Sequence, residues 1–189
     1  MTIAQTTPPA LEPISLSEAK AFLRVDHTAD DALIAALIKA AREFLETTIS
    51  QSLMTQTWRQ YESGLPQSRE ISAGVRPVQS LAAVTVFGAD GTPRVLSEQE
   101  ASILSPGHDA RLRFHGTLAA SDAMNGIEID WVVGWGDTSV AVPAALRHAI
   151  QLLVVHWYEF RGAVAASQQP VSLPPGFDAL VRPYRRVHV

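Results

Sequence analysis

Two carboxylates, Glu128 and Asp130, are the residues in this chain whose type and spacing best suit catalysis. They lie in the segment Ile127 to Val133, where apolar and polar residues alternate, and this pattern predicts a β-strand with both carboxylates on one face. Carboxylates within reach of each other can act as a general acid and a general base. The simpler interpretation is the solvent-facing side of an antiparallel strand, and we keep catalysis as the alternative.

The six histidines form no pattern that is typical of a metal site. His148 and His156 lie eight residues apart on one predicted helix, and His156 with Glu159 reverses the Glu-x-x-His order of di-iron bundles. His108 and His115 lack the paired spacing of zinc sites, and the sequence contains no cysteine. Because the sequence also lacks a phosphate-binding glycine loop and a Gly-x-Ser-x-Gly motif, we expect no metal, no cofactor and no enzymatic activity.

The composition is typical of a globular protein of one domain, or of one domain with an elaboration. The chain has 189 residues, of which 47% are hydrophobic and 18% are charged. It has no apolar run near the roughly 20 residues that cross a bilayer, so we expect no membrane association. The net charge is −4, although residues 143–189 carry 5 basic and 2 acidic groups. A protein that grips nucleic acid normally has a basic surplus, so we expect no sequence-specific DNA binding.

Two long helices are predicted to position the rest of the chain. One covers about residues 30–48 and has a wide apolar face. The other covers residues 143–161 and has Pro143 at its first position, where no backbone donor is needed. Apolar residues of this second helix, including Val154 and Tyr158, extend beyond its main apolar stripe. We therefore expect apolar partners on two sides of it, one of which a neighbouring subunit can supply.

Between the helices the hydrophobic period changes to two, and Asp90-Gly91 marks a hairpin turn. A capping box at Ser15 and Glu18 begins a short helix near the N-terminus, and residues 177–182 form another near the C-terminus. The predicted fold class is α+β, with a helical core of two long helices plus short terminal helices and an inserted small antiparallel β-sheet region.

The predicted organisation has three parts. Residues 1–13 form a flexible N-terminal arm, and residues 163–189 form a C-terminal tail that is rich in proline and then in arginine. The main domain, residues 14–162, combines helices in 15–50 and 143–161 with the β-rich insertion 53–136. We expect truncation after Pro175 to leave a folded protein.

Segments from about Ile14 to Tyr184 resemble, in their order, the head-tail connector (adaptor) proteins of long-tailed phages, prophages and gene transfer agents. The segments that carry the resemblance are Leu16-Ser17-Glu18-Ala19-Lys20, Leu23-Arg24-Val25-Asp26, Asp30-Asp31-Ala32-Leu33-Ile34, Ala40-Ala41-Arg42, Leu53-Met54-Thr55-Gln56-Thr57-Trp58, Gly134-Trp135-Gly136, Val142-Pro143-Ala144 and Leu146-Arg147-His148-Ala149-Ile150.

The resemblance implies a structural adaptor with no reaction of its own. Such a protein forms a ring, typically of twelve copies, beneath the portal protein, extends the DNA channel and provides the platform for the next neck protein, the stopper. DNA passes through the lumen without sequence-specific binding. The implied location is the neck of a virion or phage-like particle, after synthesis in the bacterial host cytoplasm.

By analogy with this family, the subunit interface is predicted on the two long helices and the portal contact on the C-terminal tail. The predicted interface residues are Arg42, Glu43, Arg147, Val154 and Tyr158. The predicted portal contacts are Phe177, Tyr184, Arg185 and Arg186. Two alternatives stay open: a small α+β ligand-binding protein or enzyme that uses Glu128 and Asp130, and another neck protein, either a stopper or a tail terminator.

Overall fold

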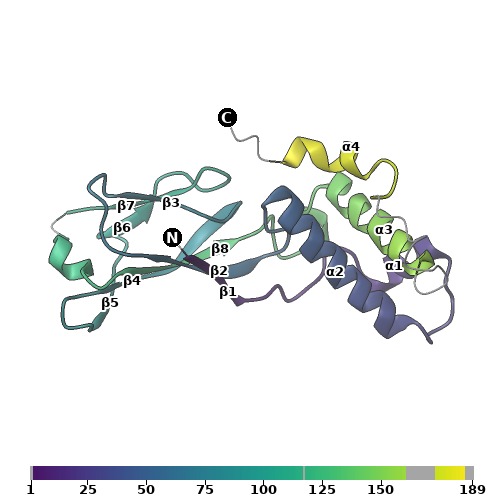
Figure 1. Ribbon diagram of the computed structural model, residues 1–189, viewed down its shortest axis with the longest axis horizontal. Coiled ribbons are helices and arrows are strands. Elements are labelled where there is room, and N and C mark those ends of the chain that lie inside the picture. The colour runs from purple at the N-terminus through teal and green to yellow at the C-terminus, as the bar shows by residue number, and fades with distance from the viewer. Residues whose placement is uncertain (1, 117, 161–172, 186–189) are drawn as a thin grey trace. The chain divides into compact units, whose positions relative to one another are not determined.

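The computed structural model describes residues 2–116, 118–160 and 173–185 (Figure 1). The chain divides into two compact units, which we describe one at a time. The β unit comprises Met1–Ala10 and Thr55–Trp135, and the helical unit comprises Leu11–Met54 and Gly136–Val189. No helix among these described ranges combines the length and apolar character that a membrane crossing requires.

The described residues of the helical unit form four α-helices, and α2 and α3 pack against each other (Figure 1). Two short 3₁₀ turns, Ser139–Ala141 and Arg182–Tyr184, precede α3 and follow α4. The helices are α1 (Leu16–Leu23), α2 (Asp31–Ile49), α3 (Ala144–Glu159) and α4 (Phe177–Val181).

The ends of these helices follow local sequence signals. The capping box at α1 is confirmed, because the Ser15 hydroxyl accepts from the Glu18 amide at 3.1 Å and the Glu18 carboxylate accepts from the Ser15 amide at 2.7 Å. Arg24 and Ser50 end α1 and α2 in the left-handed conformation. Pro143 is the N-cap of α3 rather than its first helical residue.

Residues from all four helices and from the adjoining segments form the core of the helical unit. On α2, one side is buried, with Ile34, Ile38 and Leu45 almost inaccessible to solvent. The segment that follows α2 is also buried through Leu53 and Met54, and Met54 forms an isolated parallel bridge with Gly136. The two points where the chain leaves and re-enters the helical unit are therefore adjacent.

The β unit contains two antiparallel sheets rather than the single small sheet that was predicted. The first has the order β1-β2-β8-β4-β5 and the second the order β3-β7-β6. The strands of the first sheet are β1 (Thr2–Thr7), β2 (Gln56–Glu62), β4 (Val78–Phe87), β5 (Pro93–Val95) and β8 (Ile127–Val133). The second sheet contains β3 (Glu70–Ser72), β6 (Ala101–Ile103) and β7 (Arg111–Phe114).

The alternation in β8 buries Ile127, Ile129, Trp131 and Val133 in one apolar cluster with residues of both sheets. Buried Gln60 on β2 provides an acceptor for two donors at this cluster. Its Oε1 accepts from the Trp131 indole at 2.9 Å and from a backbone amide at 3.0 Å. A buried donor without a partner destabilises the folded state, so Gln60 stabilises the packing of β2 and β8 in this cluster.

The N-terminal residues differ from the prediction of a flexible arm. Thr2–Thr7 pair antiparallel with β2, from Thr2 opposite Tyr61 to Thr7 opposite Thr57. The sequence of β1 lacks the apolar alternation that signals a strand, and five of its six residues are exposed. Backbone pairing with β2 makes this segment a strand, and the sequence of the segment alone does not predict that pairing.

Candidate assembly surfaces

Arg42 lies on the buried side of α2, with 4% of its side chain exposed. Its Nε donates to Glu12 at 2.8 Å, and its Nη1 donates to Glu46 at 2.7 Å. Burial opposes the charge on the guanidinium, but the Glu46 and Glu12 carboxylates outweigh burial and raise the pKa of Arg42. The other Glu46 oxygen accepts from the Leu53 amide at 2.7 Å. Arg42 therefore joins three segments of the helical unit and presents little surface to another chain.

Three other predicted interface residues also make contacts within the helical unit. Arg147 on α3 donates to the Pro13 carbonyl at 3.2 Å and to Glu18 at 2.6 Å. The Tyr158 hydroxyl donates to Asp30 at 2.6 Å. Val154 is buried. Of the five residues in the prediction, Glu43 is the exposed one; 56% of its side chain is accessible, and its carboxylate lies 4.0 Å from Lys39.

The predicted portal contacts are divided between the core and the surface. Phe177 and Val181 on α4 are 0% exposed, so Phe177 belongs to the helical core. The Phe177 ring lies 6.1 Å from the Phe44 ring on α2. The Gln51 side-chain amide donates to the Tyr184 carbonyl at 2.7 Å.

Arg185 is more accessible, and it donates to the exposed Asp178 at 2.9 Å. Arg186 lies outside the described residues.

α2 has an exposed apolar stripe, which the sequence did not distinguish from the buried apolar residues of the same helix. We define the α2 stripe as Leu33, Ala36, Leu37, Ala40 and Phe44, which recur every three or four residues. Leu33 is 37% exposed and Phe44 is 38% exposed. Helical periodicity placed both in the same wide apolar face as Ile34 and Ile38, because periodicity alone does not say how much of a wide face is covered. An exposed row of apolar side chains is typical of a surface that binds another chain.

One arginine on the neighbouring strand forms ion pairs with both Glu128 and Asp130. Arg59 contacts Glu128 through Nη1 at 2.9 Å, and it contacts Asp130 through Nε at 2.7 Å and through Nη2 at 2.8 Å. The hydrogen bonds to Asp130 raise the pKa of Arg59 well above its ordinary value. An arginine fork of this kind engages both carboxylates in charge-assisted contacts, so neither is left free to act on a substrate. The geometry therefore supports a structural ion-pair network on the sheet.

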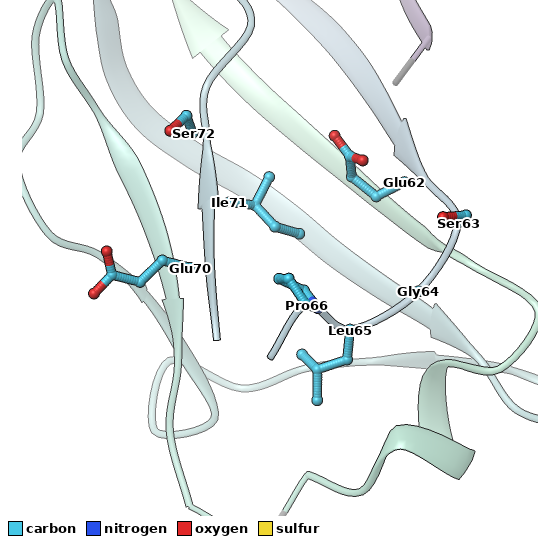
Figure 2. Close-up of a pocket in the computed structure, with 8 residues that line it drawn as sticks. All are labelled: Glu62, Ser63, Gly64, Leu65, Pro66, Glu70, Ile71 and Ser72. Atoms are coloured by element: carbon cyan, nitrogen blue, oxygen red, sulfur yellow. The ribbon is translucent and has the colours of Figure 1, made fainter. Parts of the chain in front are cut away.

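A cavity of the β unit contains two glutamates but does not bring them together as catalytic groups. Figure 2 shows a cavity of about 500 Å³ that is lined by residues from Glu62 to Pro66 and from Glu70 to Ser72. Ile71 lies between the two glutamates, and the Glu70 carboxylate points away from Glu62. Glu70 instead contacts Arg113 at 2.6 Å.

Several histidines of the described residues contact neighbouring side chains. The His108 ring lies 5.5 Å from Trp135, the His148 ring lies 5.8 Å from Phe22, and His115 shares a 2.7 Å hydrogen bond with Ser102. Within the described ranges, no group of three or more metal-ligating side chains is close enough to hold a metal ion.

Residues 13–90 match the family model of phage gp6-like head-tail connector proteins. The resemblance noted in the sequence is thereby confirmed over these residues. No curated protein matches the chain.

Three solved structures are similar along the full length. They are a chain from the neck of an empty gene transfer agent (GTA) particle computed with C6 symmetry, a chain from the virion of a native GTA particle, and a chain from the neck of a native GTA particle computed with C12 symmetry. Their sequence identities to this chain are 22%, 23% and 22%, and their TM-scores are 0.81, 0.82 and 0.80. Each match covers 100% of this chain and 97% of the other chain. The likeness establishes a common α+β fold.

Proposed function

We propose that this protein is a structural head-tail adaptor in the neck of a phage-like particle, and that it has no enzymatic activity. The observation that carries the proposal is the agreement between two independent likenesses. Residues 13–90 match a head-tail connector family, and the whole chain shares its fold with chains of GTA particle necks. The ion-paired Glu128 and Asp130 add support, because they leave the rival acid–base proposal without a free carboxylate pair.

The adaptor acts as a ring of twelve copies. One of the similar neck structures was computed with C12 symmetry, which supports this number. The α2 stripe supplies the apolar surface that a permanent contact between copies needs, since such contacts are more apolar than the remaining surface. Glu43 flanks this stripe, and although its carboxylate lies 3.4 Å from Arg42 Nη2, 56% of its side chain is exposed, so it provides a polar contact at the rim.

The ring joins the portal protein on one side and the next neck protein on the other. Tyr184, Arg185 and Arg186 form the basic end of the sequence and provide the portal contact, whereas Phe177 holds α4 in the helical core. The net charge of −4 suits a channel wall that repels the DNA phosphates and lets DNA pass without binding. The protein is present in the host cytoplasm before assembly and in the particle neck afterwards.

The test is assembly of the full chain on purified portal protein, followed by particle mass and symmetry from electron microscopy. We expect twelve copies per portal. The variant Ala40→Glu places a charge in the α2 stripe and is expected to prevent ring formation. The matched control is Ala35→Glu, because Ala35 is equally an exposed alanine of α2 but lies on the polar side with Lys39 and Glu43.

The outcomes separate the two parts of the proposal. Failure of the unaltered chain to join the portal in a defined number of copies would refute the adaptor role. Rings of normal mass from Ala40→Glu would instead show that the α2 stripe is not the subunit interface, and the adaptor role would stand.

A further inference from the structure

The outer edge of β4 has a gap in its pairing. Its inner edge pairs with β8 from Val78 to Val86, but β5 covers the outer edge only from Thr85 to Phe87. At the other end, Val78 and Gly107 exchange two backbone hydrogen bonds of 2.8 Å. Among the described residues, no strand pairs with the outer edge from Gln79 to Ala83, which we call the β4 notch. The pairing of β4 with β8 has two register shifts within this stretch, one between Val78 and Ser80 and one between Leu81 and Ala83.

A groove of about 550 Å³ lies along the β4 notch. Its far wall is β6, which is itself the last strand of the second sheet. The lining is mostly small, apolar or hydroxylic; Gln79 adds an amide, and Glu98 is the one charged residue in it. The lining residues are Gln79, Ser80, Leu81, Ala82, Ala83, Val84, Leu96, Ser97, Glu98, Ala101, Ser102, Ile103 and Pro106. The groove thus has the shape and chemistry to receive a strand with small uncharged side chains.

The opposite end of the same sheet provides such a strand. β1 is the last strand in the order, and its sequence Thr-Ile-Ala-Gln-Thr-Thr contains no charge and no proline. At about 3.3 Å per residue, its six residues span about 20 Å, and the five residues of the β4 notch span about 16 Å. The two open edges therefore match in length and in polarity.

Natural proteins usually protect an open strand edge with proline, with charge or by covering it. β5 follows this rule, because it consists of Pro93, Arg94 and Val95, and Arg94 forms an ion pair with Glu100 at 2.5 Å. β1 and the β4 notch contain no proline and no charged residue. An edge without proline or charge is expected to pair with another strand in the assembled state.

We propose that β1 of one copy pairs with the β4 notch of the next copy, so that the first sheet continues from subunit to subunit. This inference rests on the proposed function and adds to it a second ring contact, formed by the β units. The contact is heterologous, because two different edges meet, and such contacts generate a closed ring when the rotation between copies allows closure.

The absence of native cysteines makes this proposal directly testable by disulfide trapping. Full-length chains carry Ala4→Cys together with Ser80→Cys, Leu81→Cys or Ala82→Cys, and are oxidised after assembly on the portal. Within one copy, β1 and β4 are separated by β2 and β8, so about 14 Å lies between them and no intramolecular bond can form. At least one pair is expected to give a ladder of covalent multimers up to the ring. The control Ala4→Cys with Val95→Cys uses the protected β5 edge and is expected to stay monomeric.

Each result has one meaning. Rings of normal mass without a ladder from any pair would overturn the edge pairing and leave the adaptor role intact. A covalent dimer from Ala4→Cys alone would show that β1 pairs with β1, which also overturns the proposal. If no ring forms on the portal, the adaptor role and the edge pairing fail together. As a second measurement, Ala82→Lys is expected to abolish rings without changing thermal unfolding of the free subunit, whereas Val95→Lys keeps them.

Discussion

Replacement of Phe177 by alanine is expected to destabilise the helical unit by about 3–5 kcal/mol, the usual cost of truncating a buried phenylalanine. The side chain is 0% exposed and its ring lies 6.1 Å from Phe44, so the substitution leaves a cavity between α4 and α2. Folded domains are stable by only about 5–15 kcal/mol, so this loss is a large part of the total.

Truncation after Pro175 is expected to have a still larger effect. It removes Phe177 and also Val181, the second fully buried residue of α4, whose burial contributes about 2 kcal/mol more. The structure thus opposes the sequence-based expectation that this truncation leaves a folded protein. The combined loss approaches the whole stability of a small domain, and the truncated helical unit is expected to lose cooperative unfolding.

The assay is urea unfolding of the full chain, followed by far-UV circular dichroism. The matched control is Asp178→Ala, because Asp178 is next to Phe177 but its side chain is 72% exposed. Loss of its exposed ion pair with Arg185 is expected to change stability by less than about 1 kcal/mol. If Phe177→Ala unfolds within about 1 kcal/mol of the unaltered chain, then α4 is a detachable tail and the assignment of Phe177 to the core is refuted.

Three further predictions concern other parts of the molecule. Gln60→Leu leaves the Trp131 indole and a buried amide without an acceptor and is expected to cost about 2–4 kcal/mol in urea unfolding; an effect below about 1 kcal/mol would contradict the role of Gln60 in the core. Hydrogen bonds from the Ser15 amide and hydroxyl lower the pKa of Glu18, and Arg147 lowers it further. The ionised Glu18 carboxylate therefore contributes its full stabilisation above the ordinary carboxyl pKa, and this stabilisation is lost as the pH falls through the lowered pKa of Glu18. Melting temperatures measured between pH 5 and about pH 2 are therefore expected to fall less in Glu18→Gln than in the unaltered chain, and an equal fall would argue against this linkage. Glu128→Gln is expected to change stability by at most about 1 kcal/mol and to leave ring assembly on the portal unaffected, and loss of assembly would give Glu128 a role that its ion pair does not explain.

Local signals were the most predictable part of this fold. The capping box at Ser15, the turn at Asp90-Gly91 and the alternation of β8 each depend on residues that are close in sequence, and the structure has all three. In β8 the alternation also separated the buried residues from the face that carries Glu128 and Asp130. Short-range hydrogen bonds and side-chain direction decide these features, so sequence spacing is sufficient to predict them.

Features that depend on distant partners could not be predicted in the same way. Phe177 follows a proline-rich stretch that is typical of a surface tail, and its burial depends on α2 and α3. Arg42 was placed at a subunit interface by analogy with the connector family, but Glu12 and Glu46 bind it inside the unit. A charged residue with two carboxylate partners can be buried, and one sequence does not reveal those partners.

The bridge between Met54 and Gly136 has a consequence for how proteins of this architecture diverge. The inserted segment Thr55–Trp135 begins and ends at neighbouring positions of the helical unit. The helical unit therefore places little constraint on the length of the segment inserted there. Selection can therefore replace the β unit while the helical unit is retained. In this protein such a replacement must include the first ten residues, since they supply a strand to the β unit and would otherwise lose their partner.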